Sequence, residues 1–157
     1  MRNLKSKDFD IFVRLRMNAR ESLTRMSRAI QIPVSTIYDR LKEHEGRLIK
    51  KHTSLIDFSL LGYNTRAHVC VSVEKEDKQI LAEFLQKHQN INNIYKINNG
   101  FDYMVEGVFQ HIKDMEEFCD LLREKYSIKD LKVFYIIDEL QREVFMSRPE
   151  FNSMLFS

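Results

Sequence analysis

The sequence has little of several residue types that mark particular classes of protein. It contains no tryptophan, four glycines, two prolines and two cysteines in 157 residues. With 31% charged and 43% hydrophobic residues, this composition disfavours a fibrous or disordered chain. It has no run of about 18 apolar residues, and its first residues are polar, unlike a secretory signal. We therefore expect a cytoplasmic protein without a membrane span.

The cysteines and histidines do not suggest a reactive site. Cys70 and Cys119 stand singly in apolar segments, which is typical of buried thiols in a reducing compartment. The five histidines show no metal-ligand spacing. We find no glycine-rich phosphate loop, no Ser-His-Asp set and no inward-facing pair of carboxylates. The sequence thus predicts no enzyme, with no catalytic residue, cofactor or metal.

Charge is distributed unevenly along the chain. Residues 1–62 carry 13 Lys and Arg against 7 Asp and Glu, a net charge of +6, whereas residues 63–157 have a net charge of −4. A basic front half joined to an acidic back half indicates that only the front half meets a polyanion such as double-stranded DNA. A solvated surface with a chance asymmetry is the alternative.

Apolar residues recur at helical spacing in three short segments of the first 45 residues. Ser6 and Ser22 are candidate caps for the first two helices, and Pro33 marks the start of the third. The third helix has an inward face of Val34, Ile37 and Leu41. Two short helices, a tight turn and a third helix with a polar outer face predict a helix-turn-helix. An ordinary three-helix domain with solvated arginines is the alternative.

The outer face of the third helix predicts the DNA contacts. Exposed side chains near the start of a helix in the major groove can reach base edges. The candidates for base readout are Ser35, Thr36, Tyr38, Asp39 and Lys42. The candidates for phosphate contacts are Ser22, Arg25, Arg28, Arg40, Lys50 and Lys51. Residues 47–53 are basic and β-prone, and we interpret them as a wing or a linking strand.

The back half alternates between strand and helix patterns. Strands are expected at 64–74, 91–97, 103–109 and 131–137, helices at 78–88 and 112–125, and a tight turn at 98–102. The order β-α-β-β-α-β is the ferredoxin-like plan, so the fold class is α+β with both helices on one face of an antiparallel sheet. Because the strands carry apolar residues in both registers, we expect the other face to pair with a second copy as a homodimer.

These patterns divide the chain into four parts. Residues 1–53 form the winged helix-turn-helix, 54–63 a linker or hinge strand, and 64–140 the effector-binding and dimerisation domain. Residues 141–157 form a tail with an apolar end, which we expect to dock on its own chain or on a neighbouring subunit.

One family shows the same residues in the same order. The pattern Asp8-x-x-Ile11-Phe12-x-x-Leu15-x-x-Asn18-Ala19-Arg20, followed by Ser22-Leu23 and Pro33-x-Ser35-Thr36-Ile37-x-x-Arg40-Leu41, resembles the leucine-responsive/AsnC (Lrp/AsnC) family of prokaryotic transcription regulators. Residues 49–53, Leu61-Gly62-Tyr63 and Gly100-Phe101-Asp102-Tyr103 are similar to that family too. The resemblance implies a winged helix-turn-helix, a "regulation of amino acid metabolism" (RAM) domain, and dimers that assemble into tetramers or octamers.

The resemblance also implies a site for a small effector, commonly an amino acid, between dimers. Its residues here would be Asn98, Asn99, Gly100, Phe101, Asp102 and Tyr103 in the turn, with Phe134 where relatives often carry threonine. Backbone N–H groups would receive a carboxylate, and Asp102 would accept from an ammonium group. The alternative is that Asn99-Gly100 is only favourable hairpin chemistry, with Asp102 capping the turn.

The chain departs from the family pattern at several positions. Asn99 stands where a glycine is usual and His44 where a leucine is usual. Two other functions remain as alternatives. A sirohaem-decarboxylase-like enzyme on the same scaffold is disfavoured, because residues 91–109 lack histidine and the chain lacks tryptophan. A metabolite sensor without DNA binding is disfavoured by the net charge of +6 over residues 1–62.

Overall fold

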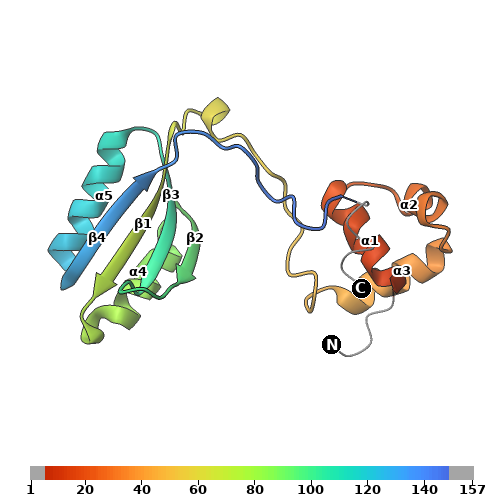
Figure 1. Cartoon of the computed structure of the whole chain (residues 1–157), viewed down its shortest axis with the longest axis horizontal. Helices are drawn as coiled ribbons and strands as arrows, with labels where there is room; N and C mark the ends of the chain where they lie inside the picture. The colour runs from red at the N-terminus through yellow and green to blue at the C-terminus, as the bar shows by residue number, and fades with distance from the viewer. Residues whose placement is uncertain (1–5, 149–157) are drawn as a thin grey trace. The chain divides into compact units, whose positions relative to one another are not determined.

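The computed structural model describes residues 6–148, which fall into two compact units. The helical unit combines residues up to Ser54 with residues from Leu140 onward, and the sheet unit is Leu55–Glu139. Figure 1 shows the helices of the first and the sheet of the second. Each unit is described by itself below.

Three helices build the helical unit: α1 (Ser6–Met17), α2 (Leu23–Ile30) and α3 (Val34–His44). All three were predicted. Ser22 caps α2, with its Oγ accepting the Arg25 N–H at 3.3 Å, whereas the side chain of Ser6 lies outside the described part of the chain. The core consists of residues no more than 3% exposed: Ile11, Met26, Ile32 and Ile37.

The basic segment after α3 is a tight turn and not the expected strand. The N–H groups of Arg47, Leu48 and Ile49 all donate to the carbonyl of His44, at 3.0–3.2 Å. Only one isolated bridge, between Glu45 and Ile49, joins residues 45–53. Residues 54–63, predicted as a linker or hinge strand, contain no strand but a short 3-10 helix, η1 (Ser59–Leu61). The physical reason is that β-propensity needs a neighbouring strand, and none is available to this segment within the described residues.

The start of the predicted tail packs on α1 of its own chain. The Arg16 guanidinium donates to the carbonyl oxygens of Glu143, at 2.8 Å, and Phe145, at 3.0 Å. Its Nη2 also lies 2.9 Å from the Glu143 carboxylate. Glu143 and Met146 adopt left-handed φ values of 56° and 58°. Residues 140–148 thus form a C-terminal segment of the helical unit, while the rest of the predicted tail, 149–157, lies outside the described residues.

The sheet unit has the predicted ferredoxin-like order. Its strands are β1 (Thr65–Val73), β2 (Ile91–Lys96), β3 (Tyr103–Phe109) and β4 (Ile128–Tyr135); its helices are η2 (Lys75–Asp77), α4 (Lys78–Lys87) and α5 (Ile112–Lys125). The spatial order is β2-β3-β1-β4, with every pair antiparallel. β4 begins three residues earlier than the sequence indicates, at Ile128.

Both helices pack on the same face of this sheet (Figure 1). Alternate residues of β1, from Ala67 to Val73, are at most 1% exposed and lie against helix residues such as Leu81 and Leu122. Gly107 lets β3 approach α5 closely, because a Cβ there would stand 2.8 Å from Met115 Cε. The period-two pattern of β1 therefore identified the helix-covered face.

The C-terminal segment predicts a measurable effect of Arg16 on stability. Arg16→Met removes two charged hydrogen bonds to backbone carbonyls, and we expect a loss of about 0.5–1.5 kcal/mol in the free energy of unfolding, because the site is partly solvated. Urea titration followed by circular dichroism measures it. Arg20→Met, at an exposed position nearby, is the control. Equal stability of the two variants would contradict the docking role of Arg16.

Candidate DNA-binding and effector sites

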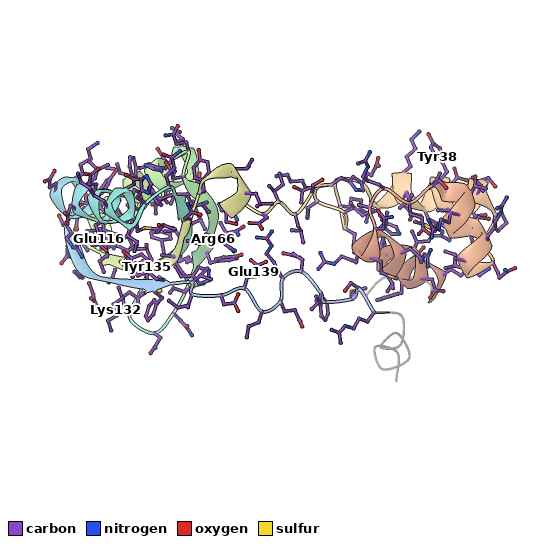
Figure 2. All side chains as sticks on the ribbon, turned by 90° about the horizontal axis from the view of Figure 1, so that it is seen from above. Tyr38, Arg66, Glu116, Lys132, Tyr135 and Glu139 are labelled. Carbon is purple, nitrogen blue, oxygen red and sulfur yellow. The ribbon has the colours of Figure 1, made fainter. Side chains whose placement is uncertain are left out.

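The five side chains predicted to read bases all lie on the exposed side of α3: Ser35, Thr36, Tyr38, Asp39 and Lys42. Tyr38 is 54% exposed and lies at the surface of the helical unit (Figure 2). The opposite side of α3 is fixed by fully buried Ile37 and half-buried Leu41, whereas Val34, which was also expected to face inward, is 40% exposed. Because Pro33 precedes α3 and has no side-chain oxygen to cap it, the positive end of the helix is left available to an anion.

A buried carboxylate connects α1 to α3. Asp8 is 0% exposed, and its Oδ1 lies 3.6 Å from Arg40 Nε and 3.8 Å from His44 Nε2. Arg40 also contacts Glu43 at 3.2 Å, and the His44 ring packs edge-on against Phe12 with centroids 5.2 Å apart. Arg40, predicted to contact phosphate, thus first holds α3 against α1. His44 fills the core position where a leucine was expected.

The other predicted phosphate contacts are exposed. Arg28, Lys50 and Lys51 face solvent. The side chain of Arg25 is 79% exposed, with Glu21 at 3.6 Å; Glu21 is held more closely by Arg14, whose Nε donates to it at 2.8 Å. Ser22 is exposed but uses its hydroxyl as the α2 cap.

The turn between β2 and β3 contains two residues with left-handed backbone. Asn99 has φ 62° and Gly100 φ 86°, a region that asparagine and glycine both tolerate. The Ile97 N–H closes the turn on the Asp102 carbonyl at 3.1 Å. Within residues 6–148 no hydrogen bond uses the N–H groups of residues 98–101. Their carbonyl oxygens accept none within these residues either, so the turn offers both backbone donors and backbone acceptors.

Asp102 is engaged within its own chain. Its Oδ2 accepts the Val73 N–H at 3.0 Å and its Oδ1 accepts from Lys78 Nζ at 2.5 Å. The Tyr103 hydroxyl donates to the Lys78 carbonyl at 3.1 Å. Burial opposes ionisation of Asp102, but the hydrogen bonds from Lys78 and Val73 outweigh it, so its pKa is lowered. The side chain of Asp102 thus joins the turn to β1 and α4.

Of the remaining predicted effector residues, Phe134 does not lie beside the turn of its own chain. Phe134 is opposite His68 on β1, and His68 is opposite Glu106, three residues along β3 from Tyr103. Lys132 lies closer: its Nζ is 5.4 Å from the centre of the Phe101 ring. Sequence reasoning missed Lys132 and Lys78. The signal for Lys132 was available, because it shares a strand face with Phe134 and lies nearer the end of β4 that faces the turn.

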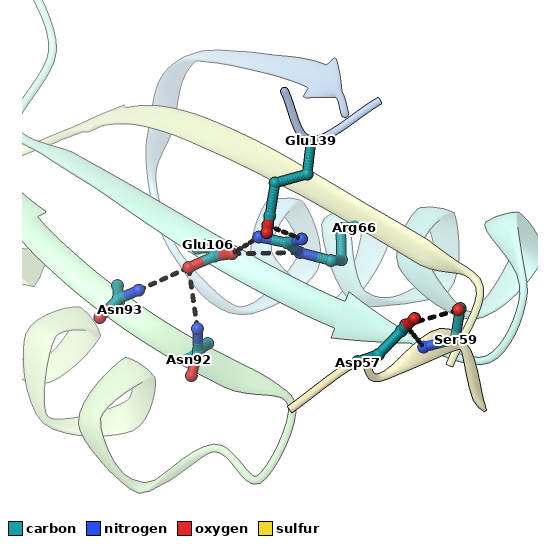
Figure 3. Close-up of polar contacts among 7 residues, drawn as sticks. All are labelled: Asp57, Ser59, Arg66, Asn92, Asn93, Glu106 and Glu139. Atoms are coloured by element: carbon teal, nitrogen blue, oxygen red, sulfur yellow. Dashed lines mark hydrogen bonds and ion pairs between the residues drawn. The ribbon is translucent and has the colours of Figure 1, made fainter. Parts of the chain in front are cut away.

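The sheet face without helices has a charged centre (Figure 3). Glu106 is 5% exposed, and its carboxylate accepts from Arg66 Nη2 at 2.7 Å, Asn92 at 2.9 Å and Asn93 at 2.5 Å. Arg66 also reaches Glu139 at 2.5 Å. Burial raises the pKa of Glu106, but the hydrogen bonds, first that of Arg66, outweigh it, and its pKa is lowered. The expectation of an apolar face is therefore corrected: apolar side chains surround a satisfied ionic network.

We also searched the described residues for a cavity, a metal site and a membrane-spanning helix. A cavity of about 470 Å³ is lined by His88, Phe109 and Phe118 among others, and burial lowers the pKa of His88 there. Among the described residues no group of three His, Cys, Asp or Glu side chains is placed to hold a metal ion. No helix in the same residues is long and apolar enough to span a bilayer.

The ionic bond of Asp102 predicts a pH-dependent stability. A lowered carboxyl pKa stabilises the folded protein above the ordinary value of about 4, and this stabilisation is lost as the pH falls through the folded pKa. Asp102→Asn should therefore destabilise the protein at pH 7, by a margin that shrinks towards pH 3. Urea unfolding across this range tests it, with exposed Asp138→Asn as the control. A margin independent of pH would contradict the ionic role.

Comparisons with known proteins agree on one family. A family model described as the Lrp/AsnC ligand binding domain matches residues 66–144. The HTH-type transcriptional regulator FL11 of Pyrococcus horikoshii is 28% identical over 109 residues, 69% of this chain and 72% of that protein. An uncharacterized HTH-type transcriptional regulator of Pyrococcus furiosus is 24% identical over 148 residues, 90% of this chain and 96% of that protein.

Solved structures show the same fold. The transcriptional regulator NMB0573 of Neisseria meningitidis, in complex with L-Met, superimposes with a TM-score of 0.85 at 19% identity, covering 97% of this chain and 99% of that one. LrpC of Bacillus subtilis gives a TM-score of 0.80 at 22% identity, covering 90% of this chain and 99% of that one.

A helix-turn-helix joined to a βαββαβ ligand-binding domain defines a DNA-binding transcription regulator with an effector domain. The family model spans half of the sequence, and this chain belongs to the Lrp/AsnC family. Since these sequence relatives are named as transcriptional regulators, the decarboxylase alternative is set aside.

Proposed function

We propose that this protein is a sequence-specific regulator that acts in the cytoplasm as a homodimer. Two α3 helices would enter major grooves of a palindromic site, about one helical turn or a multiple of it apart. The observation that carries this proposal is the exposed polar face of α3, whose opposite side is fixed by Ile37 and by the contact of Arg40 with buried Asp8. The net charge of +6 over residues 1–62 supports it.

Within this proposal the side chains divide into two roles. Base readout falls to the exposed α3 residues Ser35, Thr36, Tyr38, Asp39 and Lys42. Phosphate contacts fall first to the exposed cations Arg25, Arg28, Lys50 and Lys51. Ser22 and Arg40 are secondary candidates, because each already has a partner in its own chain.

The two roles predict different effects on DNA binding. Lys50→Ala should weaken binding to all sequences alike and reduce the slope of log K against log salt by about 1. Tyr38→Ala should instead change the preferred sequence, by about 1–3 kcal/mol at the affected base pair. Fluorescence anisotropy with selected and scrambled duplexes at several salt concentrations measures both. Lys87→Ala, exposed in the sheet unit, is the control. If the intact protein shows no salt-dependent affinity for any duplex, the proposal is wrong.

The homodimer is proposed to form through the sheet face that carries no helices. Phe134 is 56% exposed and Tyr95 49% exposed on this face, and buried Val108 and Cys70 continue it. Large exposed apolar side chains on a single-layer sheet favour contact with a second copy. The Glu106–Arg66 network is already satisfied within one chain, so closing the face would not leave an unpaired charge. Assembly of dimers into tetramers or octamers is part of the proposal.

A charge on this face should separate the dimer. Phe134→Asp places a carboxylate where the second copy would pack, and we expect at least a tenfold weaker dimer, since a buried aromatic ring contributes roughly 1.5–3 kcal/mol. Sedimentation equilibrium at several concentrations measures it. Phe134→Leu, which stays apolar, should retain most of the association. A wild-type protein that is monomeric at every concentration would refute the dimer.

We further propose that a small carboxylate-bearing effector, of the amino-acid type, modulates DNA binding from the β2–β3 turn. Residues 98–101 offer four backbone N–H donors, and Phe101 and Tyr103 are half-buried beside them. The solved relative NMB0573 is a complex with L-Met. Thermal melting in the presence of single amino acids tests whether any such molecule binds.

A further inference from the structure

A cavity of about 470 Å³ lies at the end of the sheet unit where β1 begins and β3 ends. Phe109, the last residue of β3, is opposite Thr65, the first residue of β1, so the β2–β3 turn is at the other end of the sheet. Phe109 and Phe118 line the cavity and belong to the core between the sheet and its helices. The cavity is therefore on the helix-covered side, away from the face proposed to form the dimer, and it has the size of a small-molecule site.

The floor of the cavity is a cluster of aromatic rings. Phe109 and Phe118 are at most 5% exposed, and their ring centroids are 5.5 Å apart. The half-buried ring of His88 packs on Phe118 with centroids 4.8 Å apart. Its Nδ1 accepts the Asn90 N–H at 3.3 Å, and burial lowers the pKa of His88, so the ring is uncharged at neutral pH. The floor offers apolar surface to a ligand, and aromatic rings also attract a cation.

The wall of the cavity carries carboxylates. Among the described residues that line it, Asp114 and Glu117 are acidic, and none is Lys or Arg. Asp114 Oδ2 accepts the His111 N–H at 3.0 Å, while its Oδ1 makes no hydrogen bond within residues 6–148. Glu117 is 65% exposed, and solvent weakens its contact with Lys113 at 3.5 Å. Both carboxylates can therefore accept a hydrogen bond from a ligand.

The ends of the two helices leave this negative charge in place. Residues 88–90 follow directly on the C-terminal end of α4, where a helix carries a partial negative charge. The positive end of α5 is already met by Asp114 in its first turn. Asn90 donates its side-chain amide to the Val108 carbonyl at 2.8 Å, which orients the amide, and its Oδ1 remains a neutral acceptor. The cavity thus favours a positively charged donor.

We propose that this cavity binds a small organic amine, with its ammonium group on Asp114 and Glu117 and its apolar part on Phe109 and Phe118. The site is additional to the effector site proposed at the β2–β3 turn and does not rest on DNA binding. Charge-assisted hydrogen bonds to carboxylates are the strong contacts of such a ligand. Tyr63, two residues after η1, also lines the cavity, so the amine lies where the linker joins β1.

Ligands that share an apolar group and differ in charge test this chemistry. Isothermal titration calorimetry with the full chain compares 2-phenylethylamine with 2-phenylethanol and 3-phenylpropanoate, and 3-methylbutylamine with 3-methylbutanol and 4-methylpentanoate. We expect at least one amine to bind, about tenfold or more tightly than the neutral and the anionic compound of its set. Binding of neither amine, or equal binding of the neutral compound, overturns the proposal.

Two variants that remove a carboxylate locate the amine. Asp114→Asn should weaken its binding by about tenfold. Because Asp114 also caps α5, Glu117→Gln, which leaves the cap intact, is the second variant and should weaken binding by about threefold. Glu124→Gln, on the exposed side of α5 and not in the cavity, is the control and should bind like wild type. Equal losses in all three would show a general charge effect and overturn the site.

A variant that adds a charge tests the same site without removing a cap. Gln89→Lys places an ammonium group at the cavity and should abolish amine binding, whereas Gln86→Lys, exposed on α4 and outside the cavity, should not. Wild-type affinity in Gln89→Lys would show that the amine binds elsewhere. L-phenylalanine and L-leucine are titrated as well, and tighter binding of either than of its amine, lost in Asp114→Asn, would make the cavity an amino-acid site and refute the proposal.

The DNA assay separates this proposal from the regulator function. If no amine binds to protein that retains salt-dependent affinity for a duplex, the amine site is wrong and the DNA-binding function stands. If duplex affinity is absent while an amine binds through Asp114 and Glu117, the amine site stands and the regulator proposal fails.

Discussion

A four-stranded sheet with helices on one face only needs other interactions to stabilise the side chains on its second face. In this chain the helix-covered face is apolar, as the burial of alternate β1 residues from Ala67 to Val73 shows. The open face places an ionic network of Glu106 and Arg66 among apolar side chains. Burying a charge is favourable only when its partners accompany it, and here Asn92 and Asn93 complete the set. The network sits at the middle of the face proposed for dimer formation, so it constrains how any second sheet can approach.

The helical unit also contains a buried carboxylate, and this carboxylate lies between two of its helices. Asp8 is removed from water, and Arg40 and His44, one turn apart on α3, both approach its Oδ1. Both distances are longer than a hydrogen bond, so these contacts orient α3 together with the burial of Ile37. The direction of its polar side chains is therefore set from inside the unit, by residues that touch no base. His44, a departure from the family pattern, thus helps to hold α3 against α1 through its contacts with Asp8 and Phe12.

Most of the fold was predictable because its signals are local and periodic. The alternation in β1, the Ser22 cap and the corner at Pro33 each act within a few residues, and each was predicted in place. The strand expected after α3 did not form because pairing depends on a neighbour that the sequence does not reveal. At the candidate effector site, Asp102 and its partner Lys78 are 24 residues apart, so pattern reasoning could not tell a free carboxylate from an occupied one. Phe134 was considered there because of the family resemblance, whereas Lys132, two residues away on the same strand face, was not.

The contact of Arg16 with Glu143 and Phe145 builds the helical unit from two separate stretches of the chain. Because the chain comes back to α1 after β4, the sheet unit is topologically an insertion within the helical unit, held at both of its ends. The first 54 residues are consequently an incomplete module. A chimaera that grafts them alone onto a foreign sensor would leave Arg16 without its backbone acceptors, whereas one that exchanges residues 55–139 would keep the recognition module whole.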